Sequence, residues 1–430
     1  MRKVWLWRAL DALWWAALAV YILAGVVDVP FHGDESMHIA LSRDYAHVFQ
    51  QHNLDVILYS AAPADPAMQE LRLLNGSLPR WAFGLAWDVA GVDAADLNTP
   101  WDWGVGWDWN VTIGHLPSDR LLHAARFSSA LLTVISAWGV FAVARLVGGR
   151  AVAYLASALY TTAPAVLLNG RRAMLEGALL AFSTLTVLAA LGLLRAEGRG
   201  RARWWHWALL GALSGLAVAA KHTGALTVAL VFAALLWTGW RRGALRRTLA
   251  ALTGAGALAL AVFLLLNPTW WSDVAGTPAR VVELRERVME SQRYVYGSYP
   301  DWAARGAGLV RYTVYAEPQY FEDPRWATYP VITDAIAAYE RTPWRGLNAG
   351  VLGALAWLLG AAWGTAALWL RRSTPEAVLL LIWTWGTALV LLLSVPFGWQ
   401  RYYLPLMPPL AVLTALGWVR MVRALRKEWA

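Results

Sequence analysis

The stretch MLEGALLAFSTLTVLAALGLL (residues 174–194) carries one charged side chain, Glu176, in a run of apolar and small residues. A helix needs about 20 such residues to cross a hydrocarbon layer of ~30 Å. Similar runs recur along the 430-residue chain, which is 58% hydrophobic and only 15% charged. An ordinary soluble domain carries about 25% charged residues. The sequence therefore predicts an all-α polytopic membrane protein.

The apolar runs predict about ten membrane-spanning helices with mostly short connections, the first of them a retained anchor. The predicted spans cover residues 8–29, 124–145, 151–169, 174–194, 206–220, 223–240, 249–267, 347–370, 376–395 and 402–422. Two long polar segments, 30–122 and 268–345, interrupt a single membrane domain that extends over residues 1–430. Apolar residues at roughly helical spacing in 35–49, and the helical stretch 278–296, predict amphipathic helices in these two loops.

The distribution of basic residues predicts the orientation of the chain, since cytoplasmic loops carry an excess of arginine and lysine. Alternate ends of the predicted spans hold Arg2, Lys3, Arg8, Arg145, Arg150, Arg195, Arg199, Arg201, Arg203, Arg241, Arg242, Arg246, Arg247, Arg371, Arg372, Arg420, Arg423, Arg426 and Lys427. The short loops at the other ends hold only Arg171, Arg172, Lys221 and Arg401. We therefore expect both termini in the cytoplasm and both long loops on the outer face of the cell membrane. This topology accounts for the net charge of +9, so no nucleic-acid partner is predicted.

Four places near the predicted outer face carry ionisable side chains at membrane depth, where such groups are costly and therefore informative. Asp34 begins an acidic pair in FHGDESMHIALSRDYA (31–46), and Glu176 lies just inside the fourth predicted span. Lys221 is the one lysine away from the chain ends, and Arg401 begins the last predicted span.

Each of these residues also has a purely structural interpretation. Asp34 could cap an amphipathic helix, and Glu176 could pair with Arg171 or Arg172 at a helix entrance. Lys221 could snorkel from a helix end, and Arg401 could anchor the interface. Taken together, however, two acids and several cations at one level suit displacement at a carbon that bears a phosphate. The acid would activate the nucleophile, and the cations would stabilise charge on the departing phosphate.

Five ordered stretches resemble the GT-C glycosyltransferases, in particular protein O-mannosyltransferases and aminoarabinose transferases that use polyprenyl-phosphate sugars. They are HGDES (32–36), RLLHAARFSSALL (120–132), NGRRAMLEGALL (169–180), GLAVAAKHTGAL (215–226) and RYYLPLMPPLAVL (401–413). The resemblance implies that Asp34 is the catalytic carboxylate and that Glu176 occupies a second acidic position, where many relatives carry aspartate. It also implies that Lys221 contacts the lipid-linked phosphate, with Arg401, Arg171 and Arg172 as further phosphate ligands. Glu35 and His38 would contact these site residues rather than the substrate.

The chain contains no cysteine, so disulfides, thiolate metal sites and cysteine nucleophiles are excluded. His32, His38 and Glu35 could supply ligands to a divalent metal, as some relatives bind one. Two histidines around carboxylates are nevertheless a generic pattern. The sequence thus predicts no certain cofactor and leaves a metal open.

The expected function is transfer of a sugar from a polyprenyl-phosphate donor to a glycan, lipid or protein acceptor, by inverting displacement. The alternative is a transporter or flippase of a lipid-linked or small polar substrate. Transporters tend to place ionisable residues near the bilayer midplane, between repeated halves with broken helices. Here the charges gather toward one face, and no repeat is evident in the sequence. This pattern favours the enzyme.

Overall fold

The computed structural model describes residues 2–428, and all of the secondary structure in that range is helical. The side chains of residues 2–4 and 426–430 lie outside this description, and with them four basic residues of the predicted cytoplasmic set. Eight helices in the described range are long and apolar enough to cross a membrane, which confirms a multi-pass membrane protein. They include α1 (Arg2–Ala24), α7 (Asp119–Gly148), α10 (Glu176–Gly198), α12 (Gly224–Arg241), α13 (Leu245–Leu266), α17 (Gly350–Trp369), α18 (Pro375–Ser394) and α19 (Met407–Glu428).

The two remaining predicted spans differ from simple membrane helices. The predicted span 151–169 is a pair, α8 (Arg150–Thr161) and α9 (Pro164–Arg171), bent by 63°. The break follows from Pro164, because a proline disfavours helical backbone at the residue before it, and Ala163 is indeed extended. The predicted span 206–220 is α11 (Trp204–Ala220), an apolar helix of 17 residues. This is shorter than the ~20 residues of a typical span.

The helices pack closely through small residues, as membrane helices commonly do. A Cβ atom at Gly177, near the start of α10, would lie 2.5 Å from the backbone oxygen of Ser129 on α7. A Cβ atom at Gly224, at the start of α12, would lie 2.1 Å from the backbone oxygen of Ala217 on α11. Glycine at these two positions therefore brings the first turns of α10 and α12 close to their neighbours. Glu176 and Lys221 flank these turns.

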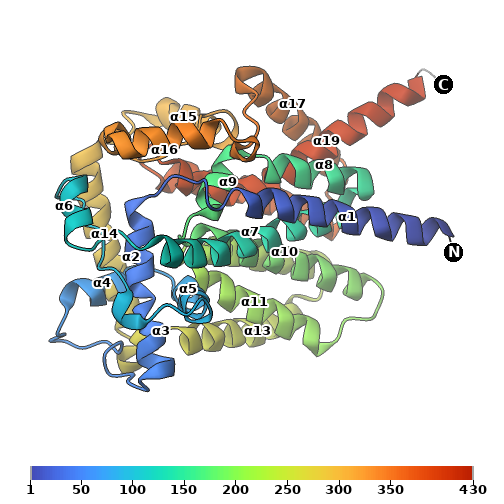
Figure 1. Cartoon of the computed structure of the whole chain (residues 1–430). Coiled ribbons are helices and arrows are strands. Elements are labelled where there is room, and N and C mark those ends of the chain that lie inside the picture. Colours follow the sequence, from blue (N-terminus) through green and yellow to red (C-terminus); the bar gives the residue numbers. More distant parts are fainter. Residues whose placement is uncertain (1, 429–430) are drawn as a thin grey trace.

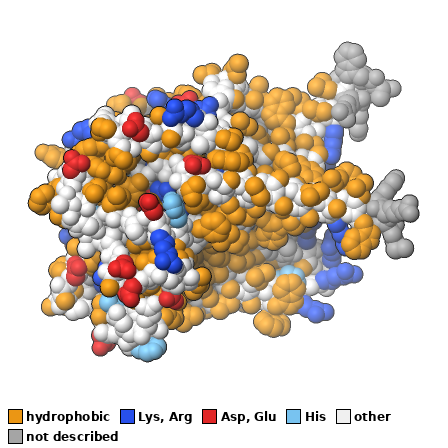
Figure 2. Space-filling model, viewed as in Figure 1, with side chains coloured by type: hydrophobic (Ala, Val, Ile, Leu, Met, Phe, Trp, Pro, Cys, Tyr) orange, Lys and Arg blue, Asp and Glu red, His pale blue; other side chains and the backbone are white. Residues whose placement is uncertain are grey.

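The two long loops between the spans gather at the end of the molecule opposite both termini (Figure 1). The first long loop contains α2 (Gly33–Leu41), α3 (Arg43–Tyr45), η1 (Ala46–Gln50), α4 (Pro66–Leu74), α5 (Leu78–Val89), η2 (Ala94–Asp96) and α6 (Trp107–Thr112). The second contains η3 (Pro268–Asp273), α14 (Thr277–Tyr296), α15 (Trp302–Val314), η4 (Pro324–Thr328), α16 (Pro330–Glu340) and η5 (Pro343–Arg345). Figure 2 shows hydrophobic side chains over the region between the two ends and acidic side chains mainly at the loop end.

An aromatic cluster joins the two loops. Phe31 lies 5.3 Å from Trp101, and Trp101 lies 5.7 Å from Trp326 of the second loop, measured between ring centroids. Burying aromatic rings of this size is strongly favourable, and tilted or edge-on pairs add to it. The cluster fixes the chain directly before α2, the helix that carries the acidic pair.

Candidate active site

Asp34 lies in the first turn of α2, but it does not cap that helix. The cap is His32, whose Nδ1 accepts a hydrogen bond from the backbone N–H of Asp34 at 3.1 Å. The carboxylate of Asp34 is instead paired with the guanidinium of Arg401. The helix-cap interpretation of Asp34 is therefore wrong, since its side chain points toward a residue 367 positions away in the sequence.

Arg401 lies on η6 (Gln400–Leu406), the short helix that leads into α19. Its Nη1 contacts Asp34, and its Nε lies 2.9 Å from Oε1 of Glu322, in an ion pair without hydrogen-bond geometry. The second oxygen of Glu322 lies 3.0 Å from Nε2 of His32. Four side chains from three distant segments thus form one cluster, which we call the Arg401 cluster: His32, Asp34, Glu322 and Arg401.

The electrostatics of this cluster keep its acids ionised. Burial would raise the pKa of Asp34, but Arg401, His32 and His38 together lower it well below its usual range. In the same way burial opposes ionisation of Glu322, whereas Arg401 and His32 lower its pKa to about 2. Both carboxylates are therefore ionised at neutral pH and can accept hydrogen bonds.

His38 lies one helical turn after Asp34 and is buried. Burial lowers its pKa to about 4, with Lys221 and Arg401 acting in the same direction and Asp34 and Glu176 opposing them. This one imidazole, which is neutral at pH 7, is thus influenced by Asp34, Glu176, Lys221 and Arg401 together.

Glu35 points away from Asp34 and holds the first loop to the membrane helices. Arg126 on α7 donates two hydrogen bonds to its carboxylate, at 2.7 and 2.8 Å. The backbone N–H groups of Ala173 and His32 donate two more, at 2.9 and 3.0 Å. A carboxylate with this many donors is satisfied within the protein, so Glu35 orients α2 and is not available to a substrate.

Glu176 pairs with Lys221, not with the arginines that the sequence suggested. Nζ of Lys221 lies 2.7 Å from Oε1 of Glu176, whose side chain is 2% exposed. Oε2 of Glu176 is buried and has no hydrogen-bond partner among the described residues. Lys221 directly follows the last residue of α11 and has extended backbone. Its side chain therefore leaves the helix axis and reaches Glu176 at the start of α10.

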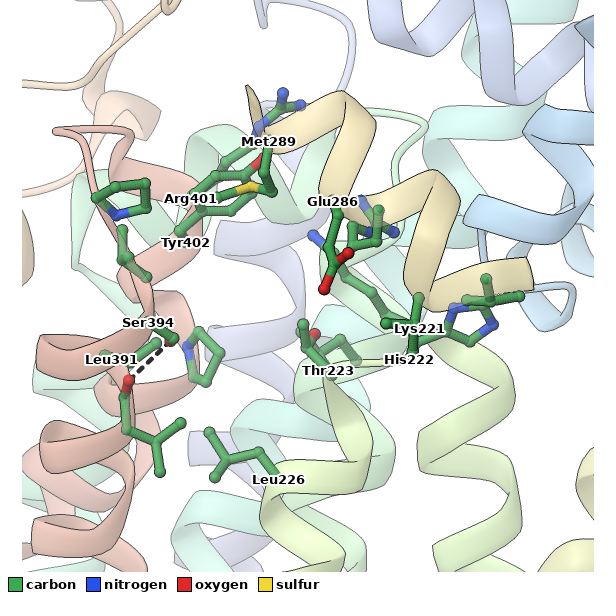
Figure 3. Close-up of a pocket in the computed structure, with 18 of the residues that line it drawn as sticks. Lys221, His222, Thr223, Leu226, Glu286, Met289, Leu391, Ser394, Arg401 and Tyr402 are labelled. Atoms are coloured by element: carbon green, nitrogen blue, oxygen red, sulfur yellow. Dashed lines mark hydrogen bonds between the residues drawn. The ribbon is translucent and has the colours of Figure 1, made fainter. Parts of the chain in front are cut away.

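Lys221 and Arg401 both line a cavity of about 780 Å³ beneath α14 (Figure 3). The ring of Tyr402 lies 5.8 Å from the charged group of each. Much of the wall is apolar, and α14 contributes charged side chains, among them Glu286, which Figure 3 shows pointing into the cavity. The apolar wall includes Leu179, Leu226, Val281, Val282, Val390, Leu391 and Val395. The arrangement can hold an anionic group near the two cations and an apolar chain beside it.

Arg171 and Arg172 do not line this cavity. Arg171 is fully buried and donates to the backbone oxygens of Ile22, Tyr21 and Trp344 and to the hydroxyl of Tyr339. Arg172 donates to the backbone oxygens of Pro30 and Tyr320. Their guanidinium groups are thus used to join the second loop to the start of the chain, and neither pairs with Glu176.

Three side chains at the site were missed from the sequence. Glu322 lies in EPQYFEDPRW (317–326), which holds three acids and no sign of which one turns inward. Arg285 of α14 lines the cavity and donates to the backbone oxygen of Leu74. His222 follows Lys221, and neither of its ring nitrogens has a hydrogen-bond partner within residues 2–428. Its place directly after the lysine was the one available signal.

The described residues contain no group of three or more His, Asp or Glu side chains arranged to hold a metal ion. Glu35 is committed to Arg126, and His32 is committed to α2 and Glu322. Two of the three residues considered as metal ligands from the sequence are therefore already engaged within the protein, and the described residues do not form a metal site.

Comparison with known proteins decides the fold. A family model for dolichyl-phosphate-mannose-protein mannosyltransferase matches residues 106–267. Apo ArnT from Cupriavidus metallidurans superposes with a TM-score of 0.52 at 15% identity, over 96% of this chain and 60% of that one. The oligosaccharyltransferase AglB from Archaeoglobus fulgidus, in complex with an inhibitory peptide and a dolichol-phosphate, superposes with a TM-score of 0.53 at 14% identity. This superposition covers 97% of this chain and 52% of AglB. The chain has the GT-C fold.

The matches confirm the resemblance to GT-C glycosyltransferases of the protein O-mannosyltransferase and ArnT type. The chain spans between half and two thirds of the length of these solved GT-C proteins. A search of curated protein sequences gave no significant match. The segment matched by the mannosyltransferase family model begins at α6 and ends with α13. It includes Glu176 and Lys221 but not Asp34, Glu322 or Arg401.

Proposed function

We propose that the chain is a membrane glycosyltransferase that moves a sugar from a polyprenyl-phosphate donor to an acceptor on the outer face. One observation carries the proposal: Lys221 and Arg401 face a single cavity with an apolar wall, and Arg401 is paired with the partly buried carboxylate of Asp34. The solved structure of AglB, which shares the fold, is a complex with a dolichol-phosphate. This supports a lipid phosphate as the donor's anionic group.

The donor phosphate would lie between Lys221 and Arg401. Lysine serves a phosphate as a point charge, and the planar arginine fork can contact two phosphate oxygens. The polyprenyl tail would lie along the apolar wall formed by α12 and α18, where Leu226 and Leu391 line the cavity. Because these helices are membrane spans, the tail could stay in the hydrocarbon layer while the phosphate reaches the cations.

The proposed reaction is an inverting displacement. The acceptor hydroxyl or amine loses its proton to Asp34 as its oxygen or nitrogen bonds to the anomeric carbon of the sugar. The bond between that carbon and the phosphate oxygen breaks, and its electron pair stays on the phosphate. The products are the glycosylated acceptor and polyprenyl phosphate, whose added negative charge Lys221 and Arg401 stabilise. A positioned general base contributes about 10²- to 10⁴-fold to such a step.

Glu176 would orient Lys221 by its 2.7 Å ion pair rather than touch the reacting atoms. Helix α14 and the rest of 268–345 would cover the donor, and aromatic side chains of the loop such as Tyr296 suit stacking against a sugar. The acceptor would approach from the loop end of the molecule, opposite the termini (Figure 1). This end faces outward if the basic residues of the other end are cytoplasmic, as the positive-inside rule requires.

The test is transfer of labelled sugar from a polyprenyl-phosphate donor in proteoliposomes that contain the purified protein. We expect Asp34→Asn to reduce turnover by at least about 100-fold, the lower end of general-base catalysis, while the donor still binds. Near wild-type turnover of Asp34→Asn would refute the assignment of the base. The same vesicles separate the enzyme from a transporter, which would move the labelled lipid across the bilayer without forming a glycosylated product.

A further inference from the structure

Arg401 is shared by two carboxylates that come from different loops. Nη1 contacts Asp34 of the first loop, and Nε lies 2.9 Å from Glu322 of the second. All three side chains are 14–15% exposed. One guanidinium thus faces two negative charges in a site that water reaches only partly, where charge interactions are stronger than at the surface.

The segment that carries Glu322 is held at each of the three preceding residues. Gln319 and Gln400 exchange backbone-to-side-chain hydrogen bonds, at 3.0 and 2.7 Å. The backbone oxygen of Tyr320 accepts from Arg172 at 3.0 Å. The ring of Phe321 stacks on His32 at 5.0 Å with an interplanar angle of 21°. Because Gln400 directly precedes Arg401, the loop and the arginine are fixed to one another, so the position of Glu322 is built into the fold.

This arrangement bears on the proposed base. If Asp34 were the sole partner of Arg401, the full attraction of the guanidinium would hold its carboxylate and oppose its taking up the acceptor's proton. A second carboxylate on the same guanidinium weakens that hold, because the two acids repel each other and divide the cation. Glu322 also keeps Arg401 in place when the donor phosphate draws the guanidinium toward the cavity.

We propose that Glu322 is a positioning residue that shares Arg401 with Asp34, so that Arg401 holds the base less strongly while it binds the donor phosphate. This inference rests on the proposed function. It assigns to the second loop a part in the reaction itself, in addition to covering the cavity. Glu322 does not touch the reacting atoms in this account, and its effect passes through Arg401.

The proposal predicts a split between turnover and donor binding. Replacing Glu322 by glutamine leaves Asp34 as the one carboxylate paired with Arg401 in this cluster. The substitution also makes the charge near the cavity more positive. We therefore expect Glu322→Gln to lower kcat by about 10- to 100-fold, since each factor of ten corresponds to about 1.4 kcal/mol in the barrier. The KM for the donor should stay within about threefold of wild type or fall, as for a residue that acts mainly on the transition state. Glu322→Asp keeps the charge and should recover part of kcat.

The matched control is Asp323→Asn, which removes the neighbouring carboxylate. Asp323 caps η4 and pairs with the exposed Arg325, so we expect kcat and KM close to wild type. Binding of sugar-free polyprenyl phosphate, followed by the rise in melting temperature, gives a readout that does not depend on turnover. We expect Glu322→Gln to bind this lipid at least as tightly as wild type.

Three results would overturn the inference. An unchanged kcat in Glu322→Gln, with the wild type active, would remove Glu322 from the reaction and leave the proposed function intact. Equal losses of kcat and of lipid binding in Glu322→Gln and Glu322→Asp would indicate a merely structural role. A wild type that binds polyprenyl phosphate but transfers no sugar with any acceptor would refute the proposed function, and this inference with it.

Discussion

The ion pair between Lys221 and Glu176 allows the structural and functional roles of one cation to be separated. In Lys221→Met the carboxylate of Glu176, 2% exposed, loses its partner at 2.7 Å, and its other oxygen is already without one among the described residues. Removing one partner of a buried pair costs about 3–5 kcal/mol of stability. The cost has a ceiling, because protonating an ordinary glutamate at pH 7 costs about 3.7 kcal/mol. We therefore expect the single variant to lose about 3–4 kcal/mol in the free energy of unfolding.

The same substitution should weaken donor binding by a separate amount. A hydrogen bond to a charged group contributes about 1.5–3 kcal/mol, which corresponds to a roughly 10- to 140-fold change in Kd. Replacing Glu176 by glutamine in the Lys221→Met background removes the unpaired charge but does not return the cation. The double variant should regain most of the lost stability and none of the lost affinity.

The assay is a double-mutant cycle on purified protein in nanodiscs, with thermal unfolding and titration of polyprenyl phosphate measured on each variant. Glu176→Gln alone is the control, since it keeps the cation of Lys221 and should bind the lipid more tightly than the double variant. Wild-type affinity in the double variant would refute the reasoning. Lys221 would then serve only to neutralise Glu176.

Three further predictions concern residues around the site. Glu35→Gln leaves Arg126 buried without its ion-pair partner, so we expect the free energy of unfolding to fall by about 3–5 kcal/mol. The Kd for polyprenyl phosphate should be unchanged in the folded fraction, and a higher Kd would contradict this. The pKa of His38 is about 4 in the folded protein against 6.5 ordinarily, so the unfolded chain binds more protons between these pH values. Stability should therefore fall as pH drops from 6.5 to 4, by about 3 kcal/mol in all, and melting temperatures of His38→Asn over this range should show a shallower fall; equal slopes would count against a buried neutral imidazole. Arg171→Gln and Arg172→Gln should each lower the melting temperature but leave the affinity for polyprenyl phosphate within about threefold of wild type. The reason is that substitutions commonly have small effects on a site that the side chains do not touch. A larger loss of affinity in either variant would indicate that this arginine does bind the phosphate.

The membrane helices could be predicted from the sequence because hydropathy reports directly on burial in lipid. Each predicted span corresponds to a helix or a bent pair. The bend at Pro164 is a local steric effect and could have been predicted from the residue itself. The shortness of α11 was also predictable, since the predicted span 206–220 ends at the same residue as α11 (Trp204–Ala220).

The site was only partly predictable. Asp34, Glu176, Lys221 and Arg401 stood out because ionisable groups near membrane depth are rare, and the structure brings these four together. Their pairing was not predictable, since Asp34 and Arg401 are 367 positions apart. For the same reason Glu322 could not be distinguished from the other acids of its loop.

The two arginines before α10 show the limit of arguing from sequence distance. Arg171 and Arg172 precede Glu176 by about one helical turn, which suggested an ion pair on one face. The chain between them is not continuous helix, however, because α9 ends at Arg171 and α10 begins at Glu176. The intervening turn directs both guanidinium groups to backbone oxygens elsewhere.

The central claim is that the cavity beneath α14 holds the donor phosphate between Lys221 and Arg401. The most direct test is an experimental structure of the protein with polyprenyl phosphate bound in a nanodisc. We expect phosphate oxygens within hydrogen-bond distance, about 2.7–3.2 Å, of both Lys221 Nζ and the Arg401 guanidinium, with the tail along α12 and α18. A phosphate bound elsewhere, with the Lys221–Glu176 and Arg401–Asp34 pairs undisturbed and the cavity filled only by solvent, would contradict it.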